Sequence, residues 1–143
     1  MSAIPRPAAF ELSNPAGLYD PRPNAYSHVA ALAPGARLVF IAGQGGEDAE
    51  GRLSADFAEQ ARQALANVAT ALQSQGAGLA QVFKLTLLIV DHDPQRLAAW
   101  VREADLAWGG AMKPVCTLIP VPRLALEGML IEIEAVAAVS TGV

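Results

Sequence analysis

Two glutamates near the carboxyl end of the chain have the residue type and spacing that suit acid–base chemistry. Glu132 and Glu134 lie in the segment Met129 to Val139, where acidic and apolar residues alternate. Because successive side chains of a β-strand point to opposite faces, both carboxylates are predicted on one face and Ile133 on the other. A carboxylate beside a bound electrophile can orient or deprotonate water. Glutamate is more often a solvated surface residue, and the pattern leaves both roles open.

The single cysteine, Cys116, is a second candidate for chemistry. It falls in the predicted strand Val115 to Val121, on the same side as Leu118 and opposite Thr117. A free cysteine is usually a small buried apolar residue. As a nucleophile its thiol needs a nearby base or cation, and His28 is the only attractive partner. Both interpretations remain open, and no intramolecular disulfide is possible with one cysteine.

The two histidines and the glycine-rich segment offer little chemistry of their own. His28 and His92 are isolated from ligands at metal-site spacing, so no metal or cofactor is expected. His92 lies between Asp91 and Asp93, and we interpret it as part of a turn into a helix. The run Gly43-Gln44-Gly45-Gly46 is not followed by Gly-Lys-(Ser/Thr) or by a helix start, so it is interpreted as a turn rather than a phosphate loop.

The elements that would position these residues alternate between strand and helix. Apolar runs predict strands at Leu38–Ala42, Val82–Val90, Val115–Val121 and Met129–Val139, the last two joined by a turn containing Glu127-Gly128. Helical periodicity predicts one helix from Asp56 to Gly76 and a second that begins at Asp93-Pro94 and ends at Gly109-Gly110. Asp56 and Glu59 resemble a capping box, and the predicted buried stripes are Phe57, Ala61, Leu65, Val68 and Leu72 in the first helix and Leu97, Val101, Ala104 and Trp108 in the second. This order predicts an α+β sheet with both helices on one face.

Composition predicts one soluble domain over residues 1–143, with an irregular proline-rich segment at 1–25. The chain is 52% hydrophobic and 17% charged, and its mean hydropathy of +0.30 favours apolar surface buried between subunits. A net charge of −4 without a basic run argues against a nucleic-acid partner. No signal core and no apolar run long enough to cross a membrane are seen, so the cytoplasm is expected.

Several motifs together resemble the RidA/YjgF family of reactive-intermediate deaminases. They are Tyr26-Ser27-His28, Ala42-Gly43-Gln44, the helix Gln60–Asn67, Lys113–Thr117 and the ending Ile131-Glu132-Ile133-Glu134. The resemblance covers about Tyr26 to Val139. It implies a chorismate-mutase-like fold with a mixed six-stranded sheet and two helices on one face, assembled as a homotrimer with small-molecule ligands in clefts between subunits.

The resemblance also implies which residues line that cleft. Glu132 matches the family's cleft glutamate, and Tyr26 matches a tyrosine that closes the site. Gly43, Gln44 and Thr117 fall in the matching motifs at two strand ends, and Arg102 falls where many members have an asparagine.

Two positions depart from the family pattern. Cys116 stands where the family has an arginine that clamps the carboxylate of an imino acid, and Ala42 stands where serine is frequent. A thiol has no positive charge, so imino acids are expected to be poor ligands unless Arg102 or Arg123 supplies another cation.

Three functions remain compatible with the sequence. The first is a hydrolase or deaminase acting on a small imine-like or enamine-like electrophile that lacks the usual carboxylate, with Glu132 as the catalytic residue. The second is a noncatalytic trimer that binds a small molecule. The third is an endoribonuclease or translation inhibitor, which the acidic charge disfavours.

Overall fold

The computed structural model describes residues 8–141 of the chain. The amino-terminal segment predicted at 1–25 therefore lies partly outside the described residues. The strands are β1 (Phe10–Ser13), β2 (Val29–Leu32), β3 (Arg37–Gln44), β4 (Val82–Val90), β5 (Val115–Val121) and β6 (Ile131–Val139). The helices are α1 (Phe57–Gln73) and α2 (Pro94–Trp108), with short 3-10 turns at Arg22–Asn24 and Leu79–Gln81. The predicted strands and both predicted helices are confirmed, with two differences in bounds: β3 is longer than the predicted Leu38–Ala42, and β6 begins two residues later than expected.

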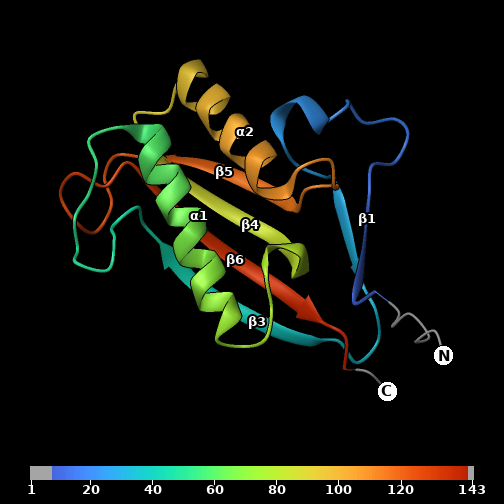
Figure 1. Cartoon of the computed structure of the whole chain (residues 1–143). Coiled ribbons are helices and arrows are strands. Elements are labelled where there is room, and N and C mark those ends of the chain that lie inside the picture. The colour runs from blue at the N-terminus through green and yellow to red at the C-terminus, as the bar shows by residue number, and fades with distance from the viewer. Residues whose placement is uncertain (1–7, 142–143) are drawn as a thin grey trace.

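Both helices cover one face of a four-stranded sheet, as Figure 1 shows. The strand order is β3-β6-β4-β5, with β4 and β5 parallel and the other neighbours antiparallel. The two remaining strands, β1 and β2, form a separate antiparallel hairpin-like pair. The predicted six strands are therefore present but divided into two sheets. A single bridge between Ser27 and Val115 links the segment before β2 to the start of β5.

The helix α1 begins where its capping residue predicts. The Asp56 side chain accepts a hydrogen bond from the Glu59 backbone N–H at 2.9 Å. The return bond of a capping box is absent, because the Asp56 N–H donates to the hydroxyl of Ser54 at 3.0 Å. After the helix, Gly76 adopts a φ of +70°, a conformation that favours glycine.

The helix α2 has its predicted start but a different buried face. Asp93 caps it by accepting from the Arg96 N–H at 2.7 Å, and Pro94 occupies the first turn. The predicted stripe of Leu97, Val101, Ala104 and Trp108 is only partly right, because the buried residues are Ala99, Trp100, Glu103 and Ala104. Glu103 is buried because it pairs with Arg62 of α1 at 2.8 Å. The ion pair thus lies at the contact between α1 and α2.

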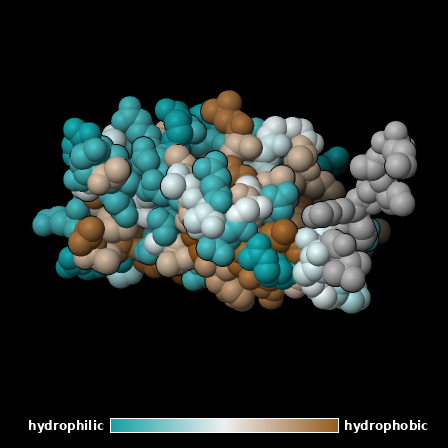
Figure 2. All heavy atoms as spheres, turned by 60° about the horizontal axis from the view of Figure 1, so that its bottom comes forward, coloured by the Kyte–Doolittle hydropathy of each residue, from teal (hydrophilic) through white to brown (hydrophobic). Residues whose placement is uncertain are grey.

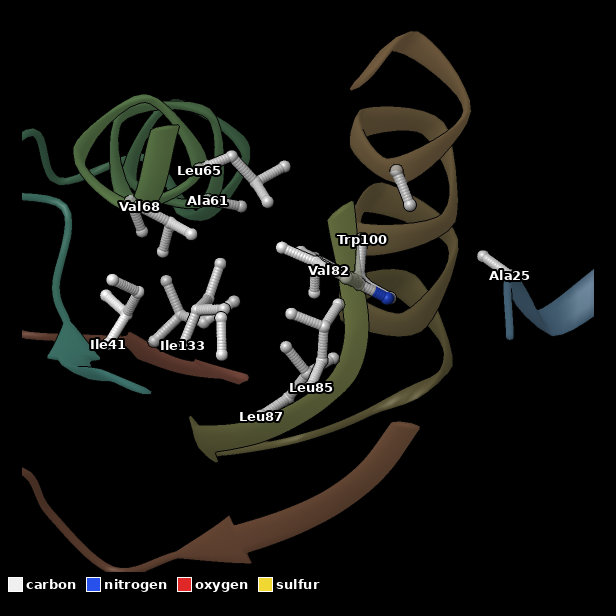
Figure 3. Close-up of a cluster of buried hydrophobic side chains, with 14 of the residues drawn as sticks. Ala25, Ile41, Ala61, Leu65, Val68, Val82, Leu85, Leu87, Trp100 and Ile133 are labelled. Atoms are coloured by element: carbon white, nitrogen blue, oxygen red, sulfur yellow. The ribbon is translucent and has the colours of Figure 1, made fainter. Parts of the chain in front are cut away.

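The hydrophobic core lies between the helices and the sheet. In Figure 3, Ala61, Leu65 and Val68 of α1 face Ile41 and Ile133 of the sheet, while Trp100 lies between α2 and β4. Along β6 the residues Ile131, Ile133, Ala135 and Ala137 are fully or almost fully buried. Glu134 between them is exposed, so the predicted alternation of this strand is confirmed.

The sheet face opposite the helices is partly apolar and exposed. Phe40 of β3 is 72% exposed and Leu38 is 42% exposed, although both belong to a strand with a buried opposite face. The side of the molecule that carries β3 is brought forward in Figure 2, where hydrophobic residues gather along the lower margin. Within residues 8–141, none of the helices has the length and apolar character needed to cross a membrane.

Candidate functional site

The carboxylate of Glu132 lies directly against the backbone of Gly43. Glu132 is on β6, which runs between β3 and β4, and its side chain leaves the sheet on the face opposite the helices. A Cβ atom added to Gly43 would lie 2.7 Å from the Glu132 Cδ atom, so no side chain fits between them. Glycine at this position therefore leaves the space that the carboxylate occupies.

A local irregularity in β3 brings Gly43 and Gln44 to this position. The pairing of β3 with β6 shifts register between Ile41 and Gln44, as in a β-bulge, and such bulges re-aim side chains. The Gln44 side chain donates back to the Ala42 carbonyl at 3.0 Å. The strand continues through Gln44, two residues beyond its predicted end at Ala42. Gly43 thus lies against Glu132, and Gln44 pairs with Ile133, the next residue of β6.

Gln60 of α1 holds the start of β6 in place. Its side chain is fully buried and donates to the Gly128 carbonyl at 2.8 Å, while its Oε1 atom accepts from the Leu130 N–H at 2.9 Å. These bonds join the first turn of α1 to the loop before β6, two residues ahead of Glu132. The position of the carboxylate therefore depends on α1 as well as on the sheet.

Cys116 lies on the other side of the sheet, in a cavity of about 410 Å³. It pairs with Leu85 across β4 and β5 and packs against the core, on the helix side of the sheet. The cavity is bounded by β4, β5, α2 and the segment before β2. Tyr26 and Thr117 line it together with Cys116, so these three predicted site residues are also brought together.

Burial keeps the thiol protonated. Removal from water raises the pKa of Cys116 from an ordinary 9.0 to about 12, against a smaller opposing effect of the Lys84 charge. A nucleophilic cysteine requires the reverse shift. The structure therefore favours the interpretation of Cys116 as a small, neutral lining residue over its interpretation as a nucleophile.

His28 is bonded elsewhere and supports Tyr26 instead of activating the thiol. Its Nε2 atom lies 2.8 Å from the Tyr19 carbonyl oxygen. The rings of Tyr19, Tyr26 and His28 pack edge to face with centroids 5.4 to 6.4 Å apart. The Tyr19 and Tyr26 hydroxyls are hydrogen-bonded, and this bond, with burial, raises the pKa of Tyr26. Tyr26 is thus held as a neutral phenol at the cavity.

The remaining predicted cations do not reach this cavity. Arg102 is exposed on α2 and Arg123 is exposed after β5, and neither lines the cavity. Sequence reasoning missed Lys84, the one charged residue in the otherwise apolar strand β4. Its ammonium donates to the Thr86 hydroxyl at 3.0 Å, and it lines a neighbouring groove that also touches Tyr26, His28 and Cys116.

The subunit thus holds two separate groups of site residues. Gly43, Gln44 and Glu132 lie on the open face, whereas Tyr26 and Cys116 lie at the cavity beside β5. Thr117 borders that cavity, but it pairs with Thr86 and its side chain shares the open face with Glu134. One strand, β4, separates β6 from β5. Glu132 and Cys116 therefore point away from each other within one chain.

Comparison with known families identifies the chain. The model of a family described as Endoribonuclease L-PSP matches residues 20–139. The chain belongs to this family, which is the RidA/YjgF family. The resemblance found in the sequence motifs is therefore confirmed.

Relatives of the RidA/YjgF family share both sequence and fold with this chain. A RutC family protein of Pyrococcus horikoshii, PH0854, is 34% identical over 106 residues, which are 70% of this chain and 78% of the relative. The Rid-family protein YyfB of Yersinia pestis, described as of unknown function, has a TM-score of 0.86 at 35% identity and covers 92% of this chain and 99% of its own. E. coli TdcF, solved with bound serine, has a TM-score of 0.63 at 26% identity and covers 90% of this chain and 94% of its own.

The protonated state of Cys116 predicts slow alkylation. A pKa near 12 in place of 9.0 lowers the thiolate fraction at pH 8 by roughly a thousandfold. We expect iodoacetamide to modify the native protein at least a hundred times more slowly than the chain unfolded in urea, as measured by intact-mass spectrometry. Native alkylation within tenfold of the unfolded rate would show an activated thiol and contradict this assignment.

Proposed function

We propose that this RidA/YjgF protein hydrolyses a small imine or enamine that carries no carboxylate next to the reacting carbon. The observation that carries the proposal is the pairing of a water-accessible Glu132 carboxylate with Gly43, in a protein whose family arginine is replaced by the neutral Cys116. A carboxylate is a suitable base for water, and none of the described residues that line the cavity carries a guanidinium to hold an anionic substrate.

The reaction needs only water and proton transfer. Glu132 takes a proton from water as the water oxygen bonds to the imine carbon, and the C=N electron pair moves to nitrogen, which gains a proton. The resulting carbinolamine then loses the amine as the C–N bond breaks and a carbonyl forms, with the protons redistributed through the same carboxylate. An enamine first takes a proton on carbon to give the imine. No cofactor is required for either sequence.

A homotrimer would join the two groups of site residues. The resemblance to the family places ligands between subunits, and the exposed apolar residues Leu38 and Phe40 offer a surface for such contact. Glu132 of one subunit would then face the cavity of its neighbour. The single free thiol suits a reducing compartment, and the cytoplasm remains the proposed location.

A noncatalytic binding protein is the second candidate. It is favoured by the cavity itself, where Cys116 and Tyr26 are held neutral and supply neither a nucleophile nor a base. Cleavage of RNA, the activity in the family's description, is disfavoured by the net charge of −4. Turnover that depends on Glu132 separates the hydrolase from the binder.

The hydrolase proposal predicts that two different changes at one place remove turnover. Glu132→Gln removes the base, and Gly43→Ala displaces the same carboxylate, whose flexible end can move without unfolding the chain. Both should lower kcat for an uncharged imine, such as that of benzaldehyde and methylamine, by roughly a hundredfold or more. Release of benzaldehyde above the spontaneous rate measures this.

The matched control for the glycine change is Gly78→Ala. Gly78 has an extended φ of −145°, and an added Cβ there would meet only the Gln81 side chain at an ordinary 3.6 Å. This variant should keep wild-type turnover. Full activity of Glu132→Gln would refute the role of Glu132, and no turnover by the wild type would favour the binding protein.

The trimer proposal predicts that a charge on the open sheet face dissociates the subunits. Phe40→Asp places a carboxylate in the proposed interface, whereas Leu106→Asp changes an equally exposed residue of α2. Light scattering after gel filtration should give three times the 14.9 kDa chain mass for the wild type and Leu106→Asp, and a smaller mass for Phe40→Asp. A wild-type monomer, or a Phe40→Asp trimer, would contradict the proposed interface.

A further inference from the structure

The cavity beside Cys116 carries no formal charge on the described residues that line it. Its apolar walls are Leu87, Leu97, Trp100 and Leu118, and its polar groups are Asn24, Tyr26, His92, Cys116 and Thr117. The volume of about 410 Å³ lies within the range of small-molecule sites. It is larger than the roughly 150 Å³ apolar cavity that accepts a benzene ring. A ring-sized hydrocarbon body therefore fits, and nothing in the lining neutralises an anion.

Trp100 presents an unused hydrogen-bond donor to this cavity. Its side chain is only 1% exposed, yet its indole N–H donates to no acceptor among the described residues, whereas the indole of Trp108 donates to the Leu79 carbonyl at 3.1 Å. Figure 3 shows the Trp100 nitrogen on the side of Ala25, whose chain neighbours Asn24 and Tyr26 line the cavity. The Trp100 nitrogen is not one of the fully enclosed polar atoms without a partner in the described residues, so it keeps contact with solvent at the cavity. Its N–H is therefore open to a ligand acceptor.

His92 supplies the second unused polar group. It lines the cavity, and its Nδ1 atom is buried without a hydrogen-bond partner among the described residues. The expectation that His92 is only part of a turn is therefore incomplete. No bond from Nδ1 to another described residue fixes the imidazole. A reorientation of the ring, which exposes this enclosed atom to the cavity, would let it pair with a ligand.

We infer that the cavity binds an uncharged, flat molecule whose hydrocarbon ring lies among Leu87, Leu97 and Leu118 and whose carbonyl-like or amide-like group pairs with Trp100 and His92. This inference deepens the proposed function, since it names the class of substrate that the same cleft would take. It also stands as a statement about binding alone. The neutral states of Cys116 and Tyr26 agree with an uncharged guest.

Benzamide and benzoate form a matched pair of probes, because they share a shape and differ in charge. We expect benzamide to bind with a Kd on the order of 1 mM, as suits nine heavy atoms, and at least tenfold more tightly than benzoate. Heteronuclear NMR titration measures both affinities and places the ligand through the amide shifts of Thr117 and Leu118. Toluene, which lacks the polar group, serves as the third probe.

Three variants assign the contacts. Trp100→Phe and His92→Phe each keep a ring but remove a polar group. Each should raise the Kd for benzamide by about three- to tenfold and change the Kd for toluene less than twofold. Trp108→Phe is the matched control and should leave all three affinities unchanged, because its N–H already pairs inside the fold. If one tryptophan variant fails to fold, His92→Phe still tests the contact.

Several results would overturn the inference. They are benzoate binding as tightly as benzamide, benzamide shifts confined to the open face near Glu132, or no benzamide binding at 20 times the expected Kd. If tight benzoate binding disappears in Lys84→Met, Lys84 supplies the positive charge that binds the carboxylate. The inference of an uncharged ligand is then refuted. Benzamide binding without imine turnover would instead keep this inference and reject the hydrolase.

Discussion

The alternation of residues along β6 constrains every other part of the molecule. This strand lies between β3 and β4, and its alternate residues fill the core under α1. A shift of one residue in its pairing would move Glu132 and Glu134 under the helices and bring Ile133 to the open face. Burying two unpaired carboxylates is costly, so the register is strongly specified. The same alternation that builds the core thus delivers the only carboxylate that touches Gly43 in the described part of the chain.

Two candidate sites lie on either side of β4, one at Glu132 of β6 and one at Cys116 of β5. On the open face of the sheet, the Glu132 carboxylate packs against Gly43, where water can reach it. On the other side a thiol with a raised pKa lines a cavity whose described lining residues carry no formal charge. An arginine at position 116 would bring a permanent cation and five donors into that cavity. With cysteine there, we propose that the cavity selects by shape and by a few hydrogen bonds, as small-molecule sites with apolar walls do.

Local patterns made most of the fold and part of the site predictable. Asp56, Asp93 and Gly76 mark helix ends through contacts within a few residues, and Glu132 follows from a two-residue period. The contact face of α2 was not predictable, because the burial of Glu103 depends on Arg62, 41 residues earlier in the chain. The same holds for Trp100 and His92, whose unused polar groups become visible only when β5 and the segment before β2 close around them. Lys84 could have been singled out from the sequence as the one charged residue of a mostly apolar strand. The face to which its side chain points, however, depends on how the strand pairs in the sheet.

Cys116 stands where the resemblance to the family implies a cation, and we propose that this difference decides what the cleft accepts. The most direct measurement is the affinity of the wild type and of Cys116→Arg for pyruvate, a stable carboxylate of imino-acid size, by calorimetry in low salt. We expect weak or undetectable pyruvate binding by the wild type and a gain of at least about tenfold in the folded variant, because a bidentate guanidinium provides two charged hydrogen bonds. Equal affinity of the two proteins for pyruvate would contradict this proposal.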